Sequence, residues 1–163
     1  MRMHRMILSL VVGGVVLFAA TATNAQGPPQ YGPPITLAQA KKVAAGAEAE
    51  AMKNKWPVVI TILDSGGNLV LVQRLDGAQF GSVEVAKDKA YSAVAFRRPT
   101  KVFQDLVEKG GANMRLLRLS GASPLEGGIP LVLDGKIVGA IGVSGVTGEQ
   151  DAQIARAGTE SLK

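Results

Sequence analysis

Two strand–turn–strand stretches constrain the fold more than any other feature of this sequence. Apolar, mostly β-branched residues fill 58–63 and 69–74, and the Asp-Ser-Gly-Gly-Asn segment between them has the composition of a tight turn. A second pair, at about 129–133 and 137–143, is joined by Asp134-Gly135, a favoured two-residue hairpin turn. Because turns this short join antiparallel neighbours, the sequence predicts two antiparallel hairpins.

Helical periodicity flanks each hairpin. Apolar residues recur at helical spacing before the first one, where Thr36 and Gln39 also fit a capping box. Ser82 and Thr100 are the expected N-caps of two helices between the hairpins, and Thr147 begins the closing helix. The expected helices span 37–53, 83–98, 101–109 and 148–162, with a short turn at 114–119. The order α-β-β-α-α-β-β-α predicts an α+β fold, in which helices cover an antiparallel sheet.

The first 25 residues have the composition of a secretory signal peptide. A short basic start precedes an uncharged apolar run at 7–20, and Thr23 and Ala25 supply small residues before a cut at Gln26. The run is shorter than the ~20 residues of a spanning helix, although a retained N-terminal anchor is the alternative. We expect a signal peptide at 1–25, a proline-rich extended leader at 26–35 and the domain at 36–163. The mature protein is then periplasmic or secreted, without a stable membrane span.

Charge and residue content exclude several classes of site. Removal of 1–25 takes away Arg2 and Arg5, which lowers the formal net charge from +5 to +3, so no nucleic-acid partner is expected. His4 is the only histidine of the sequence and is removed as well, and the sequence contains no cysteine. Disulfides, thiolate catalysis, Ser-His-Asp triads and the usual zinc and copper sites are therefore excluded for the mature protein.

Several blocks of the mature sequence resemble the GlcG/HbpS family. They are "ITLAQAKKVAAGAEAEA", "VVITILDSGGNLVLVQRLDGA", "KAYSAVAFRRPT", "PLEGGIPLVLDGKIVGAIGVSG" and "EQDAQIARAG", in the family's order and spacing across 35–162. The resemblance implies a profilin-like α+β sandwich that assembles into homo-oligomers, including octamers. It also implies a small-molecule ligand, with haem or another tetrapyrrole as the cofactor of some members. Other members accompany glycolate-utilisation genes.

Haem sites in this family often involve a histidine, and the mature domain has none. If iron is ligated, the remaining candidates are Tyr91, Met52, Met114 or a lysine. Each candidate has a structural alternative, because methionine usually fills a core and tyrosine is usually a buried aromatic with one hydrogen-bond partner. The metal ligand therefore stays open at this point.

The stretch "FRRPT" offers a candidate carboxylate site. Arg97 and Arg98 follow Phe96 directly, and the helix that begins after Thr100 exposes free N–H groups at its N-terminus. Two guanidinium groups beside such a helix end suit haem propionates or a small organic acid. The alternative is a pair of solvated or inter-subunit arginines bridged to Asp or Glu.

Glycine-rich stretches offer a second candidate site. Glu126 lies in "PLEGG", where Gly127 and Gly128 leave room for a ligand against the backbone. Gly139 and Gly142 fall inside the last predicted strand, where a subunit or a flat ligand could approach closely. The alternative is a bulge or tight helix-on-sheet packing. A dinucleotide loop is disfavoured, because its fingerprint requires a strand-turn-helix setting.

These observations favour an exported homo-oligomeric protein that binds haem, a related tetrapyrrole or another small ligand. An enzyme acting on a small hydroxy or oxo acid such as glycolate is one alternative, although the sequence shows no recognisable acid–base pair. A non-catalytic assembly module, with glycine-rich strands at subunit contacts, is the other alternative.

Overall fold

The computed structural model describes residues 27–163, so the predicted signal peptide lies outside the described residues. The elements are β1 (Gln30–Tyr31), α1 (Leu37–Asn54), β2 (Val59–Asp64), β3 (Leu69–Arg74), α2 (Ser82–Ala95), α3 (Lys101–Glu108), the 3-10 helix η1 (Gly111–Arg118), β4 (Gly128–Leu133), β5 (Lys136–Ser144) and α4 (Gly148–Glu160). The predicted order of helices and strands is confirmed, with β1 and η1 added to it. None of these helices is long and apolar enough to cross a membrane.

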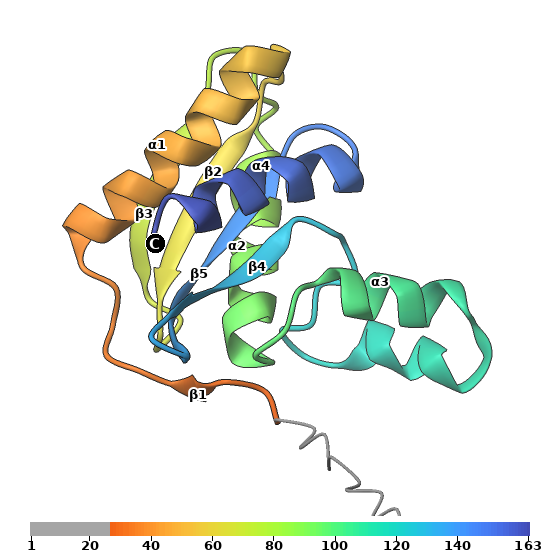
Figure 1. The fold of residues 1–163 in the computed structure, drawn as a ribbon. Helices are drawn as coiled ribbons and strands as arrows, with labels where there is room; N and C mark the ends of the chain where they lie inside the picture. Colours follow the sequence, from red (N-terminus) through yellow and green to blue (C-terminus); the bar gives the residue numbers. More distant parts are fainter. Residues whose placement is uncertain (1–26) are drawn as a thin grey trace, which may run out of the picture.

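The strands form one sheet around β5. This strand pairs antiparallel with β4 and with β2, and β2 pairs antiparallel with β3 (Figure 1). The short β1 adds a parallel pair at Gln30 and Tyr31, and beyond it the backbone N–H of Ile35 donates to the Val138 carbonyl at 2.8 Å. The second half of the predicted leader therefore lies along the sheet, because its backbone groups form hydrogen bonds with those of β5.

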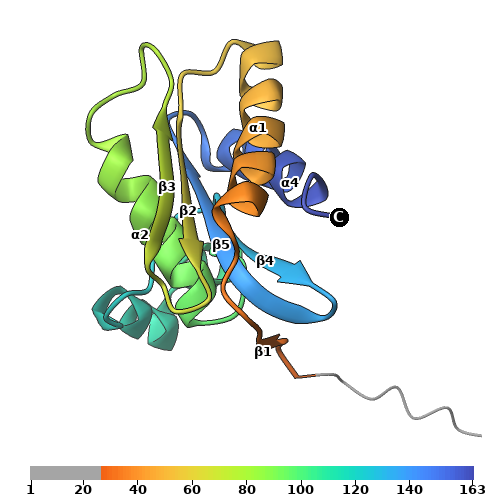
Figure 2. The ribbon, with the colours of Figure 1, turned by 90° about the vertical axis from the view of Figure 1, so that its left-hand side faces the viewer.

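Helices cover both faces of this sheet, as the sequence predicts. Figures 1 and 2 show α1 and α4 on one face and α2 on the other, while α3 and η1 lie to one side. The contact surface of α1 is narrow, since its buried residues are Ala40, Val43, Ala44, Ala47 and Ala51. Small side chains let the helix approach the strands closely. All residues of β5 after Lys136 are buried, because helices cover both of its faces.

The glycines of β5 serve this internal packing. A Cβ atom at Gly142 would collide with the Ala86 carbonyl oxygen and lie 2.6 Å from the Ala90 nitrogen, both in the backbone of α2. A Cβ atom at Gly139 would collide with the Leu63 carbonyl oxygen in β2. The hypothesis that a second subunit or a flat ligand uses this space is wrong, because the protein's own backbone fills it.

The predicted capping box of Thr36 with Gln39 is confirmed, and a second capping box, not predicted from the sequence, forms between Thr147 and Gln150. Thr100 stands at the N-cap of α3 as predicted, whereas Ser82 is the first residue of α2 and follows the N-cap Gly81. Ser82 and Thr100 make no capping hydrogen bond. Both are buried against the sheet, so their hydroxyl groups bond to strand residues instead. The Ser82 hydroxyl accepts from the Ser144 hydroxyl at 3.2 Å, and the Thr100 hydroxyl accepts from the Gly128 N–H at 2.9 Å.

Thr61, in the middle of β2, carries an unpaired buried hydroxyl. The residue is fully buried, and its Oγ1 has no hydrogen-bond partner among residues 27–163. Thr61→Val removes this hydroxyl and keeps the side-chain shape, so we expect the free energy of unfolding to rise by about 1 kcal/mol. Chemical denaturation measures the change.

Thr100→Val is the matched control for that substitution. Thr100 is also fully buried, but its hydroxyl accepts a hydrogen bond from Gly128. Its replacement leaves that N–H without a partner, so the free energy of unfolding should fall by about 1–3 kcal/mol. Equal losses from the two substitutions would show that the Thr61 hydroxyl is paired in solution.

Candidate functional site

A buried ion pair joins α2 to α4 across the end of β5. Lys89 Nζ lies 2.7 Å from Asp151 Oδ2, and the two side chains are only 4% and 3% exposed. The ammonium group also donates to the Val143 carbonyl at 2.9 Å, and the Val146 N–H donates to Asp151 Oδ1 at 3.2 Å. Two helices and a strand thus meet at one pair of opposite charges.

The environment of Asp151 shifts the pKa of its carboxyl group. Burial raises the pKa of this carboxyl above its ordinary value, because the charged form loses its hydration. The charge and hydrogen bond of Lys89 act in the opposite direction and lower that pKa without cancelling the effect of burial. Glycine is needed beside the pair at position 127 (φ +124°), since a Cβ atom there would lie 2.7 Å from the Val143 carbonyl oxygen and 2.9 Å from Asp151 Cβ.

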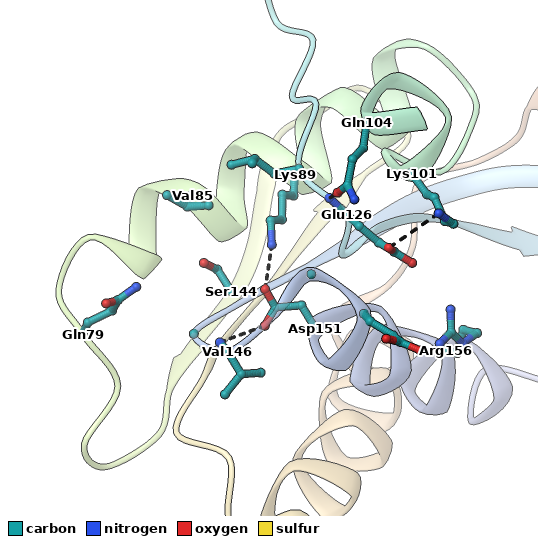
Figure 3. A pocket seen from close by; sticks show the side chains of 14 residues that line it. Gln79, Val85, Lys89, Lys101, Gln104, Glu126, Ser144, Val146, Asp151 and Arg156 are labelled. Carbon is teal, nitrogen blue, oxygen red and sulfur yellow. Dashed lines mark hydrogen bonds and ion pairs between the residues drawn. The ribbon is translucent and has the colours of Figure 1, made fainter. Parts of the chain in front are cut away.

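A cleft of about 770 Å³ opens over this pair, and we call it the polar cleft (Figure 3). It is lined by Gln79, Val85, Lys89, Lys101, Gln104, Leu125, Glu126, Ser144, Gly145, Val146, Gly148, Glu149, Asp151 and Arg156. Its volume is in the range of small-molecule sites, ~300–1,000 Å³. Its lining is rich in charged and hydrogen-bonding groups.

Glu126 lies at one wall of the polar cleft. Its backbone N–H donates to Gln104 Oε1 at 2.9 Å, which ties the loop before β4 to α3. The carboxylate is 10% exposed, and its Oε2 lies 3.9 Å from Lys101 Nζ (Figure 3). Lys101 Nζ also lies 2.7 Å from Asp105 Oδ1. Lys101 is thus held between two carboxylates.

A second hollow of about 450 Å³, the apolar slot, shares Lys101, Glu126 and Arg156 with the polar cleft. Its lining comes from α3, β4, α4 and the loops beside them: Pro99, Lys101, Val102, Asp105, Glu126, Gly127, Gly128, Ile129, Ala152 and Arg156. Apolar side chains and glycine backbone make up most of this lining. The three residues shared with the polar cleft add two positive charges and one negative charge. This arrangement suits a ligand with an apolar body and a charged group.

Three of the sequence-predicted site residues meet at these hollows. Glu126 lines both of them, and Gly127 and Gly128 line the apolar slot. Part of the room beside the glycines is filled, however. A Cβ atom at Gly128 would collide with the Lys89 carbonyl oxygen and lie 2.7 Å from Thr100 Cγ2. The space on the Cβ side of Gly128 is therefore filled by α2 and Thr100, whereas the backbone of both glycines lines the apolar slot, so a ligand against that backbone stays a prediction.

The predicted arginine pair does not converge on the start of α3. The Arg97 guanidinium carbon lies 5.8 Å from the centre of the Tyr31 ring, whereas that of Arg98 lies 5.8 Å from the centre of the Phe103 ring. Phe96 packs edge-on against Phe103, with ring centres 5.2 Å apart. The two arginines take different aromatic partners, since Arg97 has a left-handed backbone (φ +53°). The hydroxy-acid hypothesis loses one of the two features that suggested it, and the glycolate-linked members of the family remain the other.

The tyrosine and methionine candidates for iron ligation lie outside both hollows, whereas one of the lysines, Lys101, lines both of them. Tyr91 is 46% exposed, and its ring lies against Gly67 and Gly121. Met114 on η1 and Met52 on α1 are exposed by 45% and 64%, so the expectation that these methionines fill a core is wrong. The structure therefore brings neither Tyr91 nor the two methionines to the apolar slot.

Sequence reasoning missed the buried pair, although a signal for it was present. Lys89 falls within the apolar stripe of α2, three residues after Ala86 and one before Ala90. Asp151 precedes Ile154 and Ala155 by three and four residues in α4. Charged residues at apolar positions of two helices predict buried partners, and this rule would have singled out both residues.

Comparison with known proteins finds a matching family and a structural relative whose structure contains haem. The family model described as "Haem degrading protein HbpS-like" matches residues 35–160. Protein GlcG of Escherichia coli K12 is 40% identical over 102 residues, which cover 63% of this chain and 74% of GlcG. The crystal structure of HbpS has a TM-score of 0.74 and 33% identity, covering 85% of this chain and 98% of HbpS. The crystal structure of a PduOC–haem complex has a TM-score of 0.71 and 28% identity, and the match covers 78% of this chain and 94% of PduOC.

Proposed function

Because this chain belongs to the HbpS-like family, we propose that it binds haem or a related tetrapyrrole in the apolar slot. The observation that carries this proposal is the slot itself, an apolar hollow of about 450 Å³ that is lined by two cationic residues, Lys101 and Arg156. A haem is flat and apolar and bears two propionates, which suit ammonium and guanidinium groups. The haem complex of a structural relative supports the choice of ligand.

The donor groups of the slot limit how iron can be held. Residues 27–163 contain no histidine or cysteine, and the slot is lined by the Lys101 amine and by carboxylates such as Glu126. A bound haem would supply a redox-active iron centre. The residues fit the macrocycle and its propionates better than they fit the iron, so we expect a dissociation constant above the micromolar range and a high-spin spectrum.

Haemin titration followed at the Soret band tests this proposal. Arg156→Gln and Lys101→Gln each remove one cation from the slot, and each should raise the dissociation constant by up to about fivefold, as for other partly exposed charge pairs. Arg115→Gln is the matched control, because Arg115 is exposed on η1 and outside the slot. It should leave the affinity unchanged.

Two results would contradict this assignment. A tight monomeric complex with a low-spin spectrum of two nitrogen ligands would require two lysine amines, at least one of which lies outside the slot. If all three variants bound haemin as tightly as the parent protein, the ligand would not contact Lys101 or Arg156.

We also propose that the protein is exported and acts as a homo-oligomer. The composition of residues 1–25 supports export, and the resemblance to the GlcG/HbpS family supports assembly, with an octamer as one form. A native mass spectrum of protein from the periplasm reports the mature mass, the number of subunits and any retained ligand together. We expect a chain that begins near Gln26. An intact Met1 in a membrane fraction would instead indicate an N-terminal anchor.

A further inference from the structure

The ammonium group of Lys89 has one hydrogen-bond donor left over. A lysine ammonium group has three N–H donors. Two of them are used by the Val143 carbonyl and the Asp151 carboxylate, and the third has no acceptor within the described range 27–163. The side chain is 4% exposed and lines the polar cleft, so a ligand in the cleft can supply an acceptor for that donor (Figure 3).

The neighbourhood of Lys89 selects the kind of acceptor. Asp151 Oδ2 lies 2.7 Å from the same nitrogen. A second carboxylate at this point would face the negative charge of Asp151 in a poorly hydrated place, and repulsion would weaken its binding. A neutral oxygen, such as a ketone or a hydroxyl group, accepts the hydrogen bond without that repulsion. The floor of the cleft therefore suits a neutral oxygen.

The other end of the cleft suits a carboxylate. Among the charged groups of the lining, Lys89 is paired with Asp151 and Lys101 lies 3.9 Å from Glu126, whereas Arg156 has no carboxylate within 4.0 Å in the described part of the chain. Arg156 follows Asp151 by five residues on α4, which is about 7.5 Å along the helix axis. Glu149 precedes Arg156 by seven residues on the same face of α4, about two turns away, and the two side chains form no ion pair within 4.0 Å.

We propose that the polar cleft is a second binding site, for a small monocarboxylate that carries a neutral oxygen acceptor a few carbons away. Arg156 binds the carboxylate and the free N–H of Lys89 binds the neutral oxygen. The lining carries three cations and three carboxylates, so long-range attraction is small and directed hydrogen bonds provide the selectivity.

Two matched probes test the role of Lys89 without changing a buried residue. 4-Oxopentanoate has a carboxylate and a ketone, whereas pentanoate has the carboxylate alone. We expect 4-oxopentanoate to bind the purified protein about fivefold more tightly, the equivalent of one net hydrogen bond. An NMR titration that follows the amide signals of Gly145 and Val146, both in the cleft lining, measures the two affinities.

Two substitutions test the role of Arg156. Arg156→Gln should weaken the binding of both probes by about fivefold or more and keep the preference for 4-oxopentanoate. Arg115→Gln, outside the cleft, should change neither affinity. Equal binding of the two probes, equal effects of the two substitutions, or no binding of either probe would each overturn the proposal. Haemin titration is a separate readout, so failure of the haem proposal leaves these outcomes interpretable.

Discussion

Gly142→Val is expected to lower the free energy of unfolding by about 3 kcal/mol or more, or to prevent folding. The new side chain would enter the space of the Ala86 carbonyl group and the Ala90 nitrogen, both in the backbone of α2. A helix backbone cannot move aside as a flexible side chain can, so α2 would have to separate from β5. Loss of far-UV circular dichroism at a lower temperature or denaturant concentration measures the effect.

Gly81→Val is the matched control for this substitution. Gly81 has an ordinary helical backbone, and no heavy atom lies within 4 Å of the position that a Cβ atom would take. The same chemical change should therefore alter stability by less than about 1 kcal/mol. If Gly142→Val instead remained fully stable and lost only subunit assembly, the space above Gly142 would belong to a partner chain.

Lys89→Met is expected to lower the free energy of unfolding by about 3–5 kcal/mol, because it leaves the buried Asp151 carboxylate without its partner. The double substitution Lys89→Met with Asp151→Leu removes both charges and should recover most of the loss. Denaturation of the parent, the two single variants and the double variant gives the coupling energy. A double variant no more stable than Lys89→Met would mean that packing around Lys89, and not the charge pair, sets the stability.

The loss in Lys89→Met should also depend on pH. Burial already raises the pKa of Asp151 in the folded protein, and removal of Lys89 takes away the main influence that lowers it. A carboxyl whose folded-state pKa is raised stabilises the folded state when protonated, and this contribution is lost as pH rises through the folded-state pKa. The variant should therefore lose least stability below the ordinary carboxyl pKa of ~4 and most near neutral pH. A loss of equal size at both pH values would contradict this linkage.

The sequence by itself determined the features that depend on neighbouring residues. Both hairpins, the capping box at Thr36 and the order of the elements follow from short-range patterns. Turn residues set the backbone within a few positions, and a capping box joins groups three residues apart. The same local signals indicated Glu126 as a site residue, since it stands beside two glycines before a strand.

Only the tertiary structure decided which side chains meet across the fold. Lys89 and Asp151 are 62 residues apart in the chain, and their contact exists because α2 and α4 meet at the end of β5. The hydroxyl groups of Ser82 and Thr100, which local rules assign to helix caps, bond instead to strand residues 62 and 28 positions away. Gly142 and Gly139 of β5 are likewise explained only by the assembled fold, in which α2 packs on the first and β2 lies against the second. Burial is a property of the assembled elements, and it decides whether a charge, a hydroxyl group or a missing side chain stabilises the fold or forms a site.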